Sequence, residues 1–264
     1  MRSASKIFST TNGLVRLKEK DWVDKQRIAG KIAAKTLTYL ENQIKNKTTS
    51  SLIELNDAAE KLITDAGGIL TFKGYKGFPA GVCISVNKQL VHGIPSSYKL
   101  QDGDIISFDL GVTIDGAIAD TATTCIYGNP KSDRHALLVQ ATKECLKLGI
   151  ESIKIGDRIG AIGSAIYNHA KKSGFSVITQ YGGHGLDWNT PHAHPFIDNK
   201  SDIDKGLHIQ PGLTICIEPM LVIGSNNTKV LNDGWTVVTP DVGAHEEHTL
   251  FVHEDHVEII TERN

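Results

Sequence analysis

The stretch Leu100–Asp120, LQDGDIISFDLGVTIDGAIAD, decides the fold. Asp102-Gly103 is a turn signal, and Asp104–Leu110 after it has the composition of a β-strand. Asp115-Gly116 is a second turn signal. The following Ala117–Tyr127 therefore predicts the returning strand of a β-hairpin.

The carboxylates Asp109 and Asp120 lie on opposite arms of this predicted hairpin. A turn centred between Ile114 and Asp115 would place them directly opposite one another. A turn at Asp115-Gly116 would instead make them diagonal neighbours, still close enough to share one ion. Facing carboxylates repel each other unless a cation or a proton lies between them. The hairpin is therefore the first indication of a metal site.

The pattern of this stretch occurs a second time. Leu100–Asp109 and Ile209–Glu218 both read apolar, Gln, any residue, Gly, and then a carboxylate after five more residues. A His-Gly-apolar triplet precedes each copy and a second carboxylate follows it: His92 and Asp120 in the first half, His184 and Glu247 in the second. Chance similarity between two turn-and-strand units is the alternative, but the histidines and the second carboxylates favour a true repeat.

Composition sets limits on the class of protein. The chain has 264 residues, of which 40% are hydrophobic and 22% charged, as is usual for a soluble globular protein. A net charge of −2 argues against a general phosphate-binding surface, so we expect no direct nucleic-acid partner. Apolar runs are too short for a membrane span. The four cysteines have no C-x-x-C spacing, which favours reduced core thiols in a cytoplasmic protein.

The predicted elements follow one another in two similar series. Helical periodicity covers Asp21–Lys45, and a capping box at Ser51–Glu54 begins a second helix. Strands follow, and then Pro130–Leu148 predicts a third helix and Asp157 caps a fourth. We therefore predict an α+β fold with pseudo-two-fold symmetry. Its curved, mainly antiparallel sheet would carry helices on the outer face and the carboxylates on the inner face.

The domain boundaries follow from the same pattern. Residues 1–17 have little periodicity and are expected to form a loose N-terminal arm. Residues 18–264 would form a single catalytic domain with halves of about 18–128 and 129–264, because Gly128-Asn129-Pro130 is too short to be a linker.

Four carboxylates and one imidazole are the candidate metal ligands: Asp109, Asp120, His184, Glu218 and Glu247. This set carries too much negative charge for one divalent ion and suits two ions bridged by carboxylates and a water. An oxygen-rich site with one nitrogen favours Mn²⁺, Fe²⁺ or Co²⁺ over a thiolate-type zinc site. The sequence leaves open whether the aspartates are edge-strand charges, and whether Glu246 or Glu247 points inward.

Several ordered blocks of sequence resemble the type I methionine aminopeptidases, in their compact bacterial form, from about Lys18 to Ile260. Besides Asp109 and Asp120, the blocks that carry the resemblance are Gly74–Pro79, Val82–Asn87, Val91–Pro95, Gly183–Gly185, Thr214–Met220, Asp233–Thr236 and Glu247–Thr249. The resemblance implies the pita-bread fold. It also implies removal of the initiator methionine from nascent polypeptides with a small second residue.

The resemblance assigns roles to residues at the site. The five candidate ligands would bind two divalent ions (Co, Mn, Fe, Zn or Ni), with Asp120 and Glu247 bridging. A metal-bound hydroxide would attack the methionyl carbonyl while Glu218 moves its proton. His92 would orient the substrate and assist the leaving group, and His192 would donate to the carbonyl oxygen. The substrate pocket would be formed by Phe72, Tyr75, Phe78, Cys83, His92, His192 and Trp235, and a monovalent cation would lie near Asn87.

Some positions depart from the family pattern. The second catalytic histidine comes one residue later after His184 than is usual, so His194 is a rival to His192. His192 is preferred because it keeps the family's His-x-x-Pro spacing. Pro191 stands where an aromatic residue is common, and Phe72 where a cysteine is common. We therefore expect altered selectivity of the methionine pocket.

The resemblance also implies partners and a location. Nascent polypeptide N-termini near the ribosome would be the substrates, in the cytoplasm, and the protein would be a monomer that contacts neither nucleic acid nor membrane. Three other hypotheses are an X-Pro dipeptidase of the same fold, a binding protein that has lost its metals, and a metal-storage protein. The X-Pro enzymes usually carry an additional N-terminal domain. The retention of all five ligand types and of His92 argues against a binding protein without metals, and a metal-storage protein would leave the Tyr75–Cys83 pocket segment without a purpose.

Overall fold

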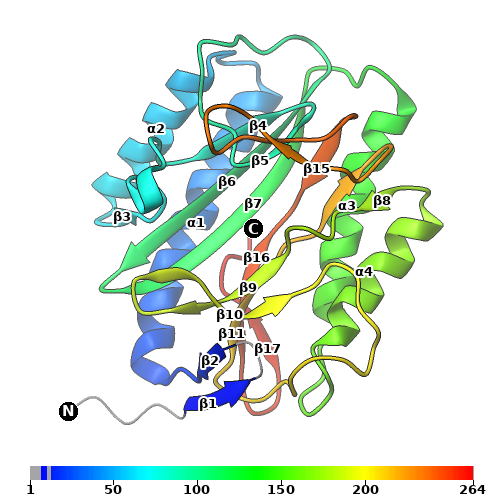
Figure 1. Ribbon diagram of the computed structural model, residues 1–264. Coiled ribbons are helices and arrows are strands. Elements are labelled where there is room, and N and C mark those ends of the chain that lie inside the picture. Colours follow the sequence, from blue (N-terminus) through cyan, green and yellow to red (C-terminus); the bar gives the residue numbers. More distant parts are fainter. Residues whose placement is uncertain (1–6, 11–12, 264) are drawn as a thin grey trace.

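Two pairs of helices flank antiparallel strands in the computed structural model, which describes residues 7–10 and 13–263 (Figure 1). The first pair, on one side of the molecule, is α1 (Lys20–Lys45) and α2 (Leu52–Asp65). The second pair, on the other side, is α3 (Asp133–Glu151) and α4 (Gly160–Lys172). No helix among these residues is long and apolar enough to cross a membrane.

The predicted central hairpin is formed by β6 (Asp104–Ile114) and β7 (Ala117–Tyr127). Ile114 pairs with Ala117, so the turn residues are Asp115 and Gly116. Both turn residues have positive φ angles, 46° and 86°, which Asp and Gly tolerate in tight hairpin turns. The diagonal arrangement of the two aspartates is therefore the one that the structure adopts.

The other strands form several short antiparallel sheets. Those of the first half are β3 (Ile69–Leu70), β4 (Cys83–Val86) and β5 (Gln89–Val91), with the short 3-10 helix η1 (Tyr75–Gly77) between β3 and β4. Those of the second half are β8 (Ser176–Val177), β9 (Gly183–Asp187), β10 (Thr190–Ile197), β11 (Thr214–Ile217), β12 (Met220–Val222), β13 (Lys229–Val230), β14 (Val237–Val238), β15 (Gly243–His245), β16 (His248–Val252) and β17 (Val257–Ile259). The sheet orders are β10-β9-β11-β16-β17, β15-β12-β8, β13-β14-β5 and β3-β6-β4, with β7 on β6.

Hydrogen bonds join the two halves along β7. The backbone N–H of Ala122 donates to the carbonyl of Glu247 over 3.3 Å, and the N–H of Glu247 donates back over 3.0 Å. The Thr249 hydroxyl accepts from the N–H of Asp120 and donates to its carbonyl, at 2.8 and 2.7 Å. These contacts hold Asp120 beside Glu247 although the two residues are far apart in sequence.

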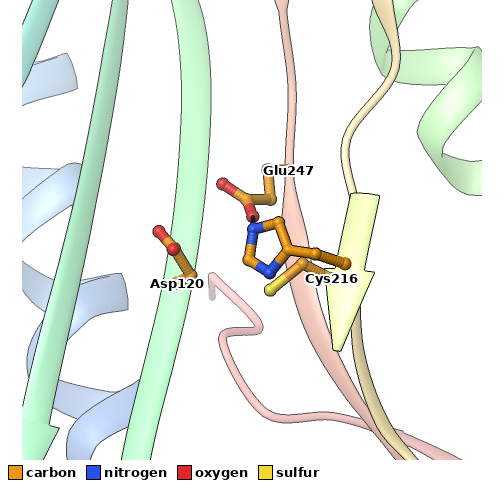
Figure 2. A group of neighbouring side chains, drawn as sticks. Asp120, Cys216 and Glu247 are labelled. Carbon is orange, nitrogen blue, oxygen red and sulfur yellow. Dashed lines mark ion pairs between the residues drawn. The ribbon is translucent and has the colours of Figure 1, made fainter. Parts of the chain in front are cut away.

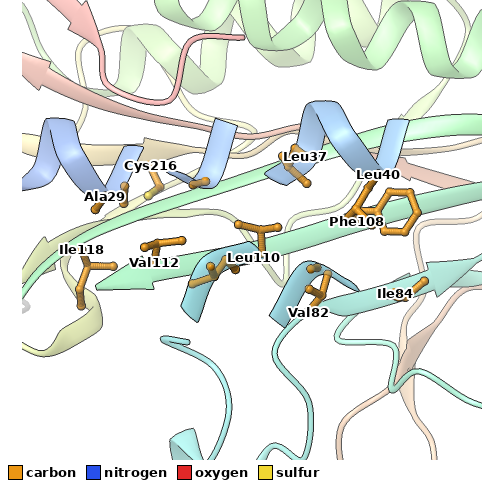
Figure 3. Close-up of a cluster of buried hydrophobic side chains, with 14 of the residues drawn as sticks. Ala29, Leu37, Leu40, Val82, Ile84, Phe108, Leu110, Val112, Ile118 and Cys216 are labelled. Carbon is orange, nitrogen blue, oxygen red and sulfur yellow. The ribbon is translucent and has the colours of Figure 1, made fainter. Parts of the chain in front are cut away.

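Each half has its own hydrophobic core. In the first half, α1 and α2 pack on β6 through side chains such as Leu37, Leu110 and Phe108, all fully buried (Figure 3). In the second half, α3 and α4 pack on β11 through side chains such as Leu138 and Ile217. Burying one such side chain stabilises the fold by about 1.5–3 kcal/mol. The helices therefore lie on the outer side, as the apolar periodicity predicts.

Two local predictions differ from the structure. Part of the expected loose arm forms a hairpin of β1 (Ile7–Thr10) and β2 (Gly13–Arg16), because β2 buries Val15; residues 1–6 and 11–12 lie outside the described part. The fourth helix is not capped by Asp157: it begins at Gly160, and the residue before it makes no side-chain cap. The division into halves at residues 128 and 129 stays a prediction.

Candidate active site

A cavity of about 320 Å³ opens between the two halves. Its wall combines apolar and aromatic side chains with a cluster of carboxylates and imidazoles. These residues are Phe72, Tyr75, Lys76, Phe78, Cys83, Val91, His92, Asp109, Asp120, Gln180, Tyr181, Gly182, His184, His192, Phe196, Glu218, Met220, Trp235 and Glu247. All of the candidate metal ligands and pocket residues predicted from the sequence are among them.

The first half contributes two buried aspartates. Asp109 pairs with Ala122 across the hairpin and Asp120 pairs with Gly111, which makes the aspartates diagonal neighbours on one face. The Oδ1 atom of each aspartate is buried and has no hydrogen-bond partner among the described residues. A buried acceptor without a partner costs about 1–3 kcal/mol, more when it is charged. Both oxygens therefore require a cation or a proton.

The second half brings His184 to the same place on β9. Its Nδ1 atom donates to the carbonyl of Gly185 over 3.1 Å. In the neutral ring the Nε2 lone pair is then free, and Nε2 lies 3.5 Å from Glu218 Oε1 and 4.0 Å from Glu247 Oε1. Glycines flank this histidine because a Cβ at Gly183 or Gly185 would lie only 2.1 Å from a backbone oxygen.

Glu218 and Glu247 both come from breaks between strands. Glu218 lies between β11 and β12, where Pro219 has no N–H to continue the ladder. The backbone carbonyl of Glu218 accepts a hydrogen bond from Asn199 Nδ2 over 3.0 Å. Glu247 faces the cavity, whereas Glu246 lies on the other side, where Arg263 pairs with it over 3.4 Å. The structure thus resolves which of the two glutamates points inward.

The pKa values of the clustered carboxyl groups are all raised. Burial, and then Asp120, raises the pKa of Asp109 well above its usual range. Burial raises the pKa of Asp120 to about 7. Burial, followed by the charges of the aspartates, also raises the pKa values of Glu218 and Glu247. Four buried carboxylates that resist ionisation together fit a site for divalent cations, because such ions supply the missing positive charge.

Figure 2 shows Asp120, Cys216 and Glu247 pointing toward the same space. One ligand atom from each of these residues and from His184 lies within 4.8 Å of the others. The Cys216 Sγ atom lies 3.4 Å from the Thr249 hydroxyl. Cys216 is a free, buried thiol of the hydrophobic core and is not in the cavity wall, so the prediction of a core thiol is confirmed.

The aromatic end of the cavity lies beside the carboxylates. Phe72, Phe78 and Cys83 are buried and form a small apolar cluster with Trp235. The Phe78 and Trp235 rings meet edge to face with centroids 5.2 Å apart. This end of the cavity offers an apolar slot with one polarizable thiol, which suits an unbranched thioether side chain.

His92 and His192 lie between the slot and the carboxylates. His92 has a φ angle of 57°, which is uncommon for a residue other than Gly, and its ring lies between Tyr181 and Trp235 at 5.9 and 6.3 Å. His192 lies 4.6 Å from the His184 ring, and its Nδ1 is 3.3 Å from the Tyr75 hydroxyl. Burial lowers the pKa of His92, and burial followed by His184 lowers that of His192. Both are therefore neutral near pH 7.

The rival histidine lies elsewhere. His194 is exposed and is not in the cavity wall, and a Cβ at Gly13 would lie 2.0 Å from its ring. The inserted segment, Asp187–Thr190, where this chain has its extra residue before His192, also points away from the cavity, because Trp188 packs on Trp22 with ring centroids 4.8 Å apart. Asp187 accepts from the buried ammonium of Lys18 over 3.1 Å. The structure thus brings His192 to the cavity and fastens the insertion to α1 and to the segment before it.

One further buried imidazole near the site had no clear sequence signal. His245, at the end of β15, is 1% exposed, and its Nε2 lies 3.3 Å from Glu218 Oε2. Burial lowers its pKa to about 3, so the ring is neutral. In the sequence it belongs to a His-Glu-Glu-His run, and the run alone does not tell which members face inward.

Asn87 has a different environment from the metal ligands. Its side-chain amide donates to Asp104 Oδ1 over 2.9 Å and accepts from the N–H of Ile105 over 3.1 Å. Its carbonyl accepts from the N–H of Gly243 over 3.1 Å. The structure brings Asn87 to the start of β15, and the monovalent cation predicted there stays a prediction.

The buried acidic centre at the end of an apolar cavity, enclosed by two similar halves, defines a metallopeptidase. Residues 24–254 match the model of metallopeptidase family M24. Methionine aminopeptidase of Mycoplasma capricolum is 38% identical over 250 residues, which cover 94% of this chain and 98% of that protein. The chain therefore belongs to family M24 and, within it, to the methionine aminopeptidases.

Solved structures agree with this assignment. The crystal structure of methionine aminopeptidase from Thermotoga maritima superposes with a TM-score of 0.90 at 33% identity, covering 94% of this chain and all of that one. Prolidase from Pyrococcus furiosus superposes with a TM-score of 0.72 at 20% identity, covering 94% of this chain and 66% of that one, and shows a shared fold alone. The predicted α+β pita-bread fold is confirmed.

Proposed function

We propose that this protein removes the N-terminal methionine from nascent polypeptides whose second residue is small. The observation that carries the proposal is the apolar slot of Phe72, Phe78, Cys83 and Trp235 beside a cluster of four carboxylates, three of them buried and Glu218 partly buried. The slot suits the methionine side chain, and the carboxylates suit a metal-dependent hydrolytic centre. The names of the relatives, which are methionine aminopeptidases, support the same conclusion.

Two divalent ions would be held by Asp109, Asp120, His184, Glu218 and Glu247. The unpartnered Oδ1 atoms of Asp109 and Asp120 and the Nε2 lone pair of His184 are donors of the kind that such ions use. When bound, the ions supply Lewis-acid polarisation of the substrate carbonyl and activation of a water. The number of ions and the choice among Co, Mn, Fe, Zn and Ni are part of the proposal.

The chain's own residues would orient the substrate and move protons. Glu218 would accept a proton from the attacking water and pass it on. His92 would contact the scissile amide and assist the leaving amine. His192, neutral and at the open side of the cavity, would donate an N–H to the carbonyl oxygen as that oxygen gains charge.

The setting of the activity is proposed on the same basis. Substrates would be the N-termini of new polypeptides near the ribosome, in the cytoplasm, and the protein would act as a monomer. A monovalent cation near Asn87 would stabilise the loop before β5. Neither nucleic acid nor membrane is a proposed partner.

Peptide hydrolysis tests the proposed function. The metal-free protein, with and without added Mn²⁺ or Co²⁺, would be assayed on Met-Ala-Ser, Met-Leu-Ser and Ala-Pro peptides, with Asp109→Ala and His92→Ala as controls. We expect metal-dependent release of methionine from Met-Ala-Ser, little from Met-Leu-Ser, and no cleavage of Ala-Pro. Cleavage of Ala-Pro without release of methionine would instead establish an X-Pro peptidase.

A further inference from the structure

A buried imidazole lies behind the carboxylate of Glu218. The side chain of His245 does not line the cavity, although Glu218 in front of it does. His245 is 1% exposed, and neither of its ring nitrogens has a hydrogen-bond partner among the described residues. A buried polar group without a partner costs about 1–3 kcal/mol. The ring therefore needs an acceptor or a ligand nearby.

The backbone of His245 is held firmly against β7. Its N–H donates to the hydroxyl of Thr124 over 2.9 Å, and the same hydroxyl donates to the carbonyl of His245 over 2.6 Å. Met220, two residues after Glu218, pairs with His245 across β12 and β15. With the main chain fixed on both sides, only rotation of the side chain can bring the ring to a partner.

Glu218 is the partner within reach. His245 Nε2 lies 3.3 Å from Oε2 of Glu218, close enough that a small rotation of the ring aligns a hydrogen bond. The other oxygen of the same carboxylate, Oε1, lies 3.5 Å from Nε2 of His184. Two imidazoles thus bracket one carboxylate, one at each oxygen.

The two imidazoles differ in where they carry their proton. The Nδ1–H of His184 donates to the Gly185 carbonyl, which leaves a lone pair on Nε2, as a metal ligand requires. His245 has no acceptor at Nδ1 among the described residues, so nothing holds its proton on that nitrogen. A neutral ring carries a single N–H, and the carboxylate attracts it to Nε2.

We propose that His245 is a positioning residue whose Nε2–H donates to Oε2 of Glu218 and leaves Oε1 to face the metal ions and the transferred proton. Its effect on catalysis rests on the proposed function, whereas its effect on metal binding does not. Partners that orient a metal ligand typically change affinity or activity by about 10–100-fold when they are removed.

Metal affinity and histidine NMR test this role. Calorimetric titration with Co²⁺ would compare wild type with His245→Gln, which keeps an N–H donor at similar reach, and with His245→Leu, which does not. His135→Leu, on α3 away from the cavity, is the matched control. We expect affinity to fall about 10–100-fold for His245→Leu, by less than about threefold for His245→Gln, and not at all for His135→Leu.

Histidine-selective ¹⁵N NMR spectra of the Zn²⁺-loaded wild type show which ring nitrogen of His245 carries the proton. The His245 signal is assigned by its loss in His245→Gln. A protonated Nε2 supports the proposal. An unprotonated Nε2, as in a metal ligand, would overturn it. So would unchanged affinity in His245→Leu, or equal losses in the Gln and Leu variants, which would indicate packing alone.

The spectra do not depend on the Leu variant, so they decide the question even if that variant fails to fold. Steady-state kinetics on Met-Ala-Ser adds the catalytic consequence, a lower kcat for His245→Leu with little change in KM. If wild type bound ions but released no methionine, the proposed function would fail, while the affinities and spectra would still decide the role of His245.

Discussion

The two hairpins that meet at the cavity are built differently. In the first half, β6 and β7 each have eleven residues and pair in an unbroken register from Asp104 to Ile114. In the second half, β9 and β10 pair with two register shifts. To the cavity wall the regular hairpin contributes two candidate metal ligands, Asp109 and Asp120. The irregular hairpin contributes one candidate ligand, His184, and also His192, which faces the open side of the cavity.

This difference separates two tasks. An unbroken ladder, closed by an Asp-Gly turn, fixes the two aspartates at one spacing, as a metal site requires. Register shifts let neighbouring residues on one strand take different directions, so β10 can turn His192 toward the cavity while His194 lies against Gly13. The regular region would determine whether the protein binds metal, and the irregular region how well it handles substrate.

The largest expected effect comes from the regular hairpin. Asp109→Ala and Asp120→Ala should each lower kcat/KM by at least about 1000-fold and remove measurable binding of one Co²⁺ in calorimetry, because each takes away a donor that no neighbour replaces. Asp115→Asn, in the turn of the same hairpin, should leave both quantities unchanged, since Asn tolerates the positive φ angle there. Activity within tenfold of wild type in either Ala variant would refute the assignment of ligands.

The irregular hairpin should give a smaller effect that depends on position. His192→Ala should lower kcat on Met-Ala-Ser by about 100-fold with ion binding unchanged, as expected for loss of one donor to a developing oxyanion. His194→Ala should change kcat by less than about threefold, because its ring packs on β2 outside the cavity. Steady-state kinetics of the two variants decides between them. The reverse order would make His194 the functional residue.

The pH dependence of stability should show the buried charge of the regular hairpin. Burial raises the pKa values of Asp109, Glu218 and Glu247 well above their usual range in the folded protein, so the stability that their protons confer is complete below the unfolded pKa values and is lost as pH rises through the folded ones. Asp120, whose folded pKa is raised to about 7, has lost most of its own contribution by pH 7. Buried histidines with lowered pKa values, such as His184 and His245, make the folded protein more stable as pH rises. This gain is complete above about pH 6.5, so it does not affect the range from pH 7 to pH 9.

The Tm of the metal-free protein should therefore fall by at least about 3 °C from pH 7 to pH 9. Saturating Mn²⁺ should abolish the fall, and Asp109→Asn should reduce it, in differential scanning calorimetry. A Tm that rises from pH 7 to pH 9 in protein without metal would contradict the assignment of raised pKa values to these buried carboxyl groups.

The smallest effect is expected from the inserted segment. Trp188 packs on Trp22 and lies under the ammonium of Lys25, 5.3 Å from its ring centroid, outside the cavity. Trp188→Ala should change the ratio of kcat/KM for methionine and norleucine peptides by less than about twofold. Phe72→Cys, inside the slot, should change that ratio more, because it alters the volume of the pocket wall. Equal shifts in the two variants would assign the selectivity to the insertion.

Much of this arrangement follows from local patterns in the sequence. The Asp-Gly signals predict β6 and β7, the repeated Gly-plus-carboxylate pattern pairs Asp109 with Glu218, and apolar periodicity predicts α1. Such features depend on near neighbours. Other features depend on packing between distant segments, which no local pattern encodes. They are the directions of Glu246 and Glu247, the N-terminal hairpin and the position of His245.

The departures at β10 show the same limit. An insertion can be counted in the sequence, but whether it enters the cavity depends on what holds it. Here Lys18 and Trp22, near the N-terminus of the chain, hold the inserted segment outside the cavity through Asp187 and Trp188. These contacts join residues that are far apart in the sequence.

Anomalous diffraction from crystals soaked in Mn²⁺ tests most directly the claim that the two halves form one metal centre. Two anomalous peaks are predicted, each contacting ligands from both halves among Asp109, Asp120, His184, Glu218 and Glu247. A map at saturating Mn²⁺ with no peak between Asp109 and Glu218, or with ions bound only elsewhere, would contradict the account.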